Sequence, residues 1–130
     1  MNLLLDTCAI IWAIAYPDRL SSTARQLITA PENAVFISPI SAAEIACACD
    51  RGRLVVRPHW KPWLRHFLGV NGWEVHPIDL PIAEEAYSLP GDFHADPADR
   101  IITATSRILN ASLLTADRKI LDYPHVTAIW

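Results

Sequence analysis

The sequence contains no internal repeat, no low-complexity segment and no stretch that resembles a linker between domains. Charged residues make up only 19% of the chain and hydrophobic residues 52%, a balance that excludes a disordered protein. A chain of 130 residues is also long enough to enclose a proper core. We therefore expect one domain that spans residues 1–130 and folds unaided.

An apolar run long enough to cross a bilayer is also lacking. The apolar stretch between residues 3 and 16 has no basic residue before it, and Asp6 interrupts it. A signal peptide needs a basic start, and a membrane helix needs a longer uninterrupted run. We expect a cytoplasmic protein that has no membrane partner.

Cysteine is scarce and odd in number, with Cys8, Cys47 and Cys49 in apolar surroundings. This favours reduced, buried thiols in the cytoplasm over a disulfide framework. Cys47 and Cys49 do not predict a zinc site, because residues two apart on a helix point in different directions. No second pair of ligands with suitable spacing is present either.

An excess of positive charge is absent as well, since the net charge is −3. That value alone would argue against a nucleic-acid-binding protein. If the candidate metal-site acids are set aside, nine acidic residues remain against eleven lysines and arginines. The acids set aside are Asp6, Glu44, Asp96, Asp99 and Asp117. The remainder of the chain is slightly basic, so net charge does not exclude a nucleic-acid partner.

Four short apolar runs each end in, or enclose, one acidic residue. Residues 3–5 lead into Asp6, residues 113–116 lead into Asp117, Asp99 precedes residues 101–104, and Glu44 lies within residues 40–46. A carboxylate near a core is costly unless it is paired or bound to a cation. Several carboxylates together also repel one another, and a hard divalent cation relieves both problems. The pattern predicts a metal-dependent active site.

Strands alternate with helices along the chain. The apolar runs predict strands at residues 3–5, 34–37, 73–78, 112–114 and 126–129. Helical periodicity and capping residues predict helices at about residues 7–15, 22–30, 39–50, 58–68, 81–89 and 97–109. Alternation of this kind implies right-handed crossovers, an α/β fold and a mostly parallel sheet.

In an open parallel sheet, ligands bind at the carboxyl ends of the strands, where the strand order reverses. Asp6 and Asp117 directly follow predicted strands, so both belong at that edge. Asp99 lies in the first turn of a helix that must begin on the same side. The three carboxylates are therefore expected to converge.

Helix capping is the simpler explanation for each aspartate taken alone. Asp6 and Asp117 each stand where an N-cap is expected, and Asp96 followed by Asp99 matches an N-cap with an acid three residues on. Glu44 is different because it lies in mid-helix, on the apolar stripe that it shares with Ile40, Ala43 and Cys47. A buried ion pair with an arginine is the remaining alternative for Glu44.

Several neighbours of the acids are candidate substrate contacts. The hydroxyls of Thr7 and Thr115 could bind a phosphate or a water on the ion, although threonine is also common at strand ends. Arg100 and Arg118 could hold a phosphate through two hydrogen bonds, with surface ion pairing as the alternative. We interpret His94 as a surface residue.

A basic stretch without any acid lies between residues 51 and 66. It contains Trp60 and Trp63 together with seven potential cations, Arg51, Arg53, Arg57, His59, Lys61, Arg65 and His66. Cations bind backbone phosphates and indoles stack on unpaired bases. Of these residues, Arg51, Arg53 and Lys61 are the candidates for nucleic-acid contacts. A solvated helix face with the tryptophans packed in the core explains the pattern equally well.

Four segments carry a resemblance to a known family. The strings LLLDTCAIIWAI, FISPISAAEIA followed by RGRL, HADPADRIITATS and LLTADRKIL resemble those of PIN-domain ribonucleases. They look most like the VapC-type toxins of prokaryotic toxin–antitoxin pairs, in order as well as in spacing. The chain departs from the pattern at Cys8, Ala48 and Ala98, and none of these departures removes a carboxylate.

The resemblance implies a three-layer α/β/α sandwich around a mostly parallel sheet and an Mg²⁺ or Mn²⁺ site. Position by position, Asp6, Glu44, Asp99 and Asp117 match the family's acidic quartet. The implied activity is an endoribonuclease that hydrolyses RNA with metal-activated water and leaves a 5′-phosphate and a 3′-hydroxyl. The implied partners are a small VapB-like antitoxin, the RNA substrate and a second copy of the chain.

Two other roles fit a PIN fold, namely a nuclease of RNA processing without a toxin role and a catalytically silent binding module. The intact quartet argues against the silent module. A haloacid-dehalogenase-like phosphatase needs a second aspartate two residues after the first, where Cys8 stands. A receiver domain needs paired acids and a late lysine, and neither is evident.

Overall fold

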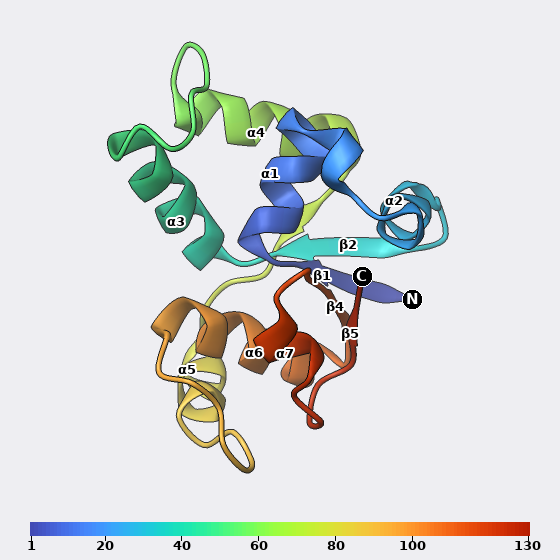
Figure 1. Ribbon diagram of the computed structural model, residues 1–130, viewed down its shortest axis with the longest axis vertical. Coiled ribbons are helices and arrows are strands. Elements are labelled where there is room, and N and C mark those ends of the chain that lie inside the picture. Colours follow the sequence, from blue (N-terminus) through green and yellow to red (C-terminus); the bar gives the residue numbers. More distant parts are fainter.

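Five parallel strands form the centre of the protein in the order β3-β2-β1-β4-β5. A computed structural model describes all of residues 1–130 (Figure 1). The strands are β1 (Asn2–Leu5), β2 (Ala34–Ile37), β3 (Glu74–Val75), β4 (Ser112–Leu114) and β5 (Ala128–Ile129). Every neighbouring pair is parallel, which confirms the predicted sheet.

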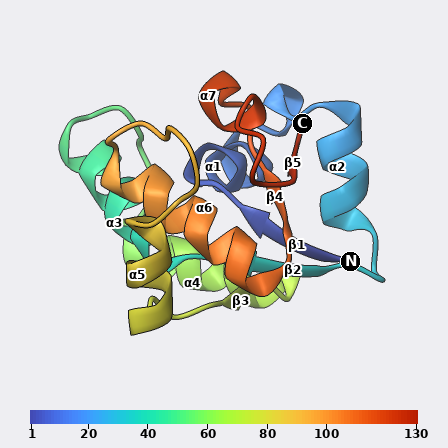
Figure 2. The ribbon, with the colours of Figure 1, turned by 90° about the horizontal axis from the view of Figure 1, so that it is seen from below.

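Helices cover both faces of the sheet, so the protein has three layers (Figure 1). One side carries α1 (Thr7–Ala15), α2 (Ser22–Thr29), α3 (Pro39–Asp50) and α4 (Trp60–Asn71). The other side carries α5 (Leu80–Ala86), α6 (Pro97–Leu109) and α7 (Arg118–Leu121). Figure 2 shows α5 packed along the outside of α6, where Ile82 and Ala86 meet Ala104. The α/β/α sandwich is confirmed.

The central strand β1 is buried on both faces because its side chains alternate between two cores. Leu3 and Leu5 pack with Ile10 and Ile45 in the core beneath α1 to α4. Leu4 packs on the opposite face with Ile102 of α6. A parallel strand covered by helices on both sides has this near-continuous apolar sequence.

The strand order reverses beside β1. The chain first builds outward from β1 to β2 and β3, and then returns to place β4 on the other side of β1. The connections after β1 and β4 therefore leave the sheet toward opposite faces. A crevice opens between them at the carboxyl ends of these two strands.

Most helix and strand boundaries match the predicted ones, and the differences lie at edges and turns. The helix expected at residues 58–68 runs over Trp60–Asn71, because Gly72 adopts the left-handed conformation (φ 66°) that ends a helix. The edge strands expected at residues 73–78 and 126–129 pair over only two residues each. The helix expected at residues 81–89 spans Leu80–Ala86.

None of the helices combines the length and the apolarity that a membrane crossing requires.

Candidate functional site

A cavity of about 260 Å³ lies at the carboxyl ends of β1 and β4, where the strand order reverses. Four of its lining residues are acids, namely Asp6, Glu44, Asp99 and Asp117. They come from the end of β1, the middle of α3, the first turn of α6 and the segment after β4. The structure brings together all four carboxylates that the sequence singled out.

Asp6 is both a helix cap and a cavity residue. Its Oδ1 accepts a hydrogen bond of 2.7 Å from the backbone N–H of Ala9, and Thr115 gives its carboxylate a second hydrogen bond. Asp6 is only 8% exposed. Burial raises its pKa to about 6 against the lowering effect of these hydrogen bonds, and the charges of Asp99 and Asp117 add to the increase.

Asp117, like Asp6, is both a helix cap and a residue of the cavity. Its Oδ1 accepts a hydrogen bond of 2.9 Å from the backbone N–H of Lys119 and so caps α7. Its own N–H donates to the hydroxyl of Thr115 at 3.0 Å. Capping therefore accounts for the positions of Asp6 and Asp117, yet it does not exclude a shared site, because a carboxylate has several lone pairs.

Asp99 is not the cap of α6, because Asp96 accepts the capping hydrogen bond from the N–H of Asp99 at 2.9 Å. The Oδ2 of Asp99 lies 2.7 Å from Nε2 of His94, and both side chains are about one quarter exposed. Burial raises the pKa of Asp99, while the hydrogen bond with His94 opposes that shift.

The sequence did not single out His94 as a contact of the acids. It stacks on Phe93 with ring centroids 4.5 Å apart, and this holds the imidazole toward Asp99. The only signal in the sequence is its position five residues before Asp99, in a loop whose path the sequence does not define.

Glu44 has no arginine partner, which removes the ion pair considered from the sequence. Its Oε1 accepts a hydrogen bond from the hydroxyl of Thr7 at the start of α1. Burial raises the pKa of Glu44, and this hydrogen bond opposes the shift. The residue therefore lies within reach of the cavity and is half-buried rather than enclosed.

Of the apolar stripe predicted around Glu44, only Ile40 packs against a core, the one on the α6 side of the sheet. Ala43 and Cys47 are exposed, and the buried residues of α3 are Ser41 and Ile45. The stripe instead lines a groove of about 430 Å³ that continues from Glu44 toward the first turn of α6. The prediction of a buried stripe was wrong for Ala43 and Cys47, because small apolar side chains suit a groove wall as well as a core.

The donor set of the cavity suits a hard divalent cation. Carboxylate oxygens are the ligands that Mg²⁺ and Mn²⁺ prefer. The raised pKa values of Asp6, Glu44 and Asp99 express the cost of holding their charges partly buried. No three acidic, histidine or cysteine side chains stand in a ready metal-binding group. An ion in this cavity would therefore need water among its ligands, which is usual for Mg²⁺.

Arg100 is not placed to hold a phosphate. Its guanidinium donates to the carbonyl oxygens of Ala86, Phe93 and His94 at 2.8 to 3.0 Å. Arg100 is therefore neither a phosphate ligand nor part of a surface ion pair. Its side chain connects the loop before α6 to the end of α5. Arg118 is 80% exposed and lies 3.8 Å from Asp122, the surface ion pairing that the sequence left open.

The predicted basic stretch divides into two parts in the fold. Arg51 and Arg53 are exposed and line the groove that begins at Glu44. Lys61 lies on another groove and stands over Trp60, which packs with Trp63 against the main core. Both tryptophans are partly buried against the core, and each also lines a groove, Trp60 that of Lys61 and Trp63 a separate one.

All three cysteines are free, but the expectation of buried thiols was wrong, because none of the three is buried. Cys8 and Cys47 are exposed and Cys49 is intermediate. Helix positions next to a cavity or a groove are apolar without being buried. Cys8 lines the acidic cavity, where partial desolvation, followed by the nearby acids, raises its pKa to about 11.

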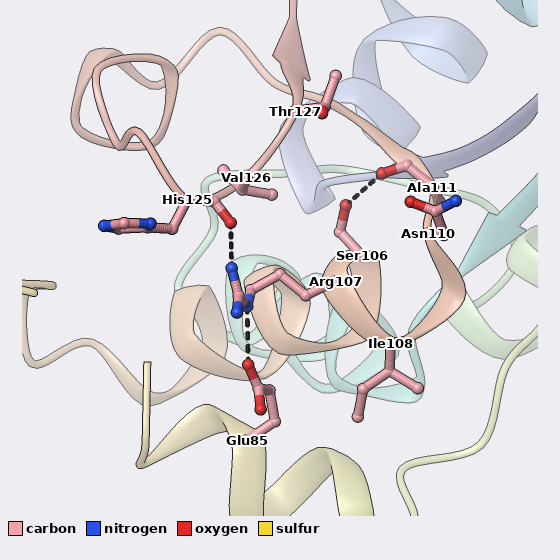
Figure 3. Close-up of a pocket in the computed structure, with 9 residues that line it drawn as sticks. All are labelled: Glu85, Ser106, Arg107, Ile108, Asn110, Ala111, His125, Val126 and Thr127. Carbon is pink, nitrogen blue, oxygen red and sulfur yellow. Dashed lines mark hydrogen bonds and ion pairs between the residues drawn. The ribbon is translucent and has the colours of Figure 1, made fainter. Parts of the chain in front are cut away.

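A larger cavity, of about 410 Å³, lies at the other end of α6, near residues 110 and 111 just before β4 (Figure 3). Its cation, Arg107, donates to Glu85 at 2.7 Å and also to the carbonyl oxygen of His125. The charge is thus neutralised within the fold. Of these two cavities, only the one lined by Asp6, Glu44, Asp99 and Asp117 gathers several acids without a lysine or arginine partner.

The family comparison agrees with the geometry. Residues 3–126 match the family described as PIN domain. The chain belongs to the PIN-domain family. It is 31% identical over 124 residues to "Ribonuclease VapC22" of Mycobacterium tuberculosis (strain ATCC 25618 / H37Rv), covering 95% of this chain and 93% of that relative. It is therefore a homologue of the VapC ribonucleases.

Solved structures share the fold. VapBC2 from Rickettsia felis, bound to a DNA fragment from its promoter, matches with a TM-score of 0.74 at 20% identity, over 99% of this chain and 98% of that chain. VapBC-1 from nontypeable Haemophilus influenzae matches with a TM-score of 0.68 at 18% identity, over 99% and 97%.

Replacing Asp6 by asparagine should stabilise the metal-free protein at pH 7. The raised pKa means that folded Asp6 binds its proton more tightly than the unfolded chain does, so stability is lost as pH rises from about 4 to about 6. At pH 7 the charge costs up to about 3 kcal/mol, and asparagine keeps the cap. In EDTA, the Tm of Asp6→Asn should exceed that of the wild type by several degrees at pH 7 and converge with it near pH 4. A constant difference across this range would contradict the assignment.

Arg100→Leu should unfold more easily than the wild type. Three carbonyl groups would lose a charged donor, which costs at least about 2 kcal/mol. Arg118→Ala is the matched control, because its side chain is exposed and weakly paired, and it should change stability by less than about 0.5 kcal/mol. Denaturant unfolding compares the two, and equal stabilities would refute the structural role of Arg100.

Proposed function

We propose that this protein is an endoribonuclease that depends on Mg²⁺ or Mn²⁺ and acts as the toxin of a toxin–antitoxin pair. The observation that carries the proposal is the convergence of Asp6, Glu44, Asp99 and Asp117 on one cavity at the switch point of the sheet. Membership of the PIN-domain family and the similarity to a VapC ribonuclease support the same reading.

The four acids would hold the ion, with Asp6, Asp99 and Asp117 as the more direct ligands and Glu44 binding directly or through water. When bound, Mg²⁺ or Mn²⁺ supplies the Lewis acidity that activates water and offsets charge on a phosphodiester. The chain's own contribution is to orient the donors. Thr115 and the N–H of Ala9 fix Asp6, and His94 fixes Asp99.

An RNA strand needs cations beside such an acidic cavity, because carboxylates repel its phosphates. Arg51 and Arg53 meet this need, since both line the groove that begins at Glu44 and neither makes an ion pair. We place the strand along this groove, with its phosphates against the two arginines. Arg118 and Thr7 are secondary candidates, and Lys61 lies on a different groove.

The proposed partners are a small VapB-like antitoxin and a second copy of the chain. Some solved structures with this fold are VapBC assemblies. An antitoxin gene directly upstream would separate the toxin role from that of an RNA-processing nuclease. Growth arrest on induced expression, relieved by co-expression of that neighbour, would test the pair directly.

Asp6→Asn should lower metal-dependent RNA cleavage by at least about 100-fold, because even outer partners of metal ligands cost 10- to 100-fold when lost. The measurement is cleavage of a defined RNA in Mg²⁺ or Mn²⁺, with mapped ends that carry a 5′-phosphate and a 3′-hydroxyl. Asp79→Asn is the matched control, since Asp79 caps α5 away from the cavity and should keep full activity. Retained cleavage in folded Asp6→Asn would refute the proposal.

The double variant Arg51→Ala with Arg53→Ala should raise KM for RNA while kcat changes less than twofold. Loss of two phosphate contacts should weaken binding by about the same factor for every RNA sequence. The slope of the logarithm of the binding constant against the logarithm of the salt concentration should fall by about one to two. Lys61→Ala is the control, because Lys61 is equally exposed but lies on another groove. An equal rise in KM for Lys61→Ala would argue against a path of the RNA along the groove that begins at Glu44.

A further inference from the structure

Ser41 is a fully buried polar side chain in α3, three residues before Glu44 and thus on a neighbouring part of the same helix face. An alanine at this position would fill a helix interior without the cost of burying a hydroxyl. The hydroxyl of Ser41 has a single hydrogen-bond partner, the hydroxyl of Thr7, at 2.9 Å. The catalytic proposal above does not use Ser41.

The direction of the hydrogen bonds follows from the chemistry of the three groups. Thr7 is within hydrogen-bond distance of both Ser41 and Glu44, but a hydroxyl carries only one hydrogen. An ionised carboxylate can only accept, so Thr7 donates to Glu44. Ser41 must then donate to the oxygen of Thr7, which still has a free lone pair.

The three residues therefore form a relay from the interior of α3, through the first residue of α1, to the carboxylate in the cavity. Donation by Ser41 strengthens donation by Thr7, because hydrogen bonds in a chain polarise one another. The relay also limits the positions that the flexible side chain of Glu44 can take. Asp6 needs no such device, since it is held by a backbone N–H and by Thr115.

We propose that Ser41 is a positioning residue that acts through Thr7 to hold Glu44 in place for the divalent cation. This inference rests on the proposed metal site and assigns to Thr7 a role other than substrate binding. The alternative is that Ser41 and Thr7 only tie α1 to α3, in which case their loss would affect stability but not the ion.

The test measures binding of Mn²⁺ alone to the purified protein by calorimetry, without RNA. Ser41→Ala and Thr7→Val should each weaken Mn²⁺ binding about three- to tenfold. Thr7→Ser keeps the hydroxyl and should stay within twofold of the wild type. Ser106→Ala is the matched control, because Ser106 is an equally buried serine whose hydroxyl donates to the carbonyl of Ala111 in the cavity of Figure 3.

A double-mutant cycle of Ser41 and Glu44 separates a positioning role of Ser41 from a purely structural one. Glu44→Gln should itself weaken Mn²⁺ binding, and Ser41→Ala added to it should have less than a twofold further effect. An equal effect of Ser41→Ala in both backgrounds, or no effect in the wild-type background, would overturn the relay and leave the metal site standing. Unchanged affinity in Glu44→Gln would remove Glu44 from the site and overturn the relay with it. Thermal melts show which variants are folded. If Ser41→Ala does not fold, Thr7→Val tests the relay in its place.

Discussion

The main constraint on this structure is the free-energy cost of holding several charged carboxylates in one crevice. Asp6 illustrates this cost, because burial and two neighbouring acids raise its pKa to about 6 although two hydrogen bonds stabilise its charged form. The raised pKa values of Glu44 and Asp99 have the same leading cause. A fold without a use for these charges would gain stability by losing them. This cost is concentrated at the switch point of the sheet, where a bound divalent cation would offset it.

Each acid has its own local support, and these supports come from different elements. Asp6 and Asp117 use the N-terminal N–H groups of α1 and α7, and Thr115 contacts both residues. Asp99 uses His94 and Glu44 uses Thr7. Capping and membership of a shared cavity are therefore not competing explanations for these positions, because a cap engages one oxygen and leaves the other lone pairs of the carboxylate free.

The cations near the site illustrate how a fold separates similar residues. Arg100 and Arg107 are committed to carbonyl oxygens or to a carboxylate and stabilise connections within the fold. Arg51 and Arg53 remain exposed on the groove beside Glu44. In the sequence all four are arginines close to predicted elements, and only their hydrogen-bond partners distinguish support of a loop from a surface that can meet phosphates.

The sequence by itself determined the alternation of helices and strands, because apolar period, prolines and capping residues act over a few neighbouring residues. The helix bounds of α1, α3 and α6 and the acids at the strand ends follow from such local rules. Only the tertiary structure decided that His94 meets Asp99, that Arg100 faces carbonyls, and that Ala43 and Cys47 line a groove. These outcomes depend on how loops and helix faces meet across the fold, and a spacing in the chain does not encode a distance between elements.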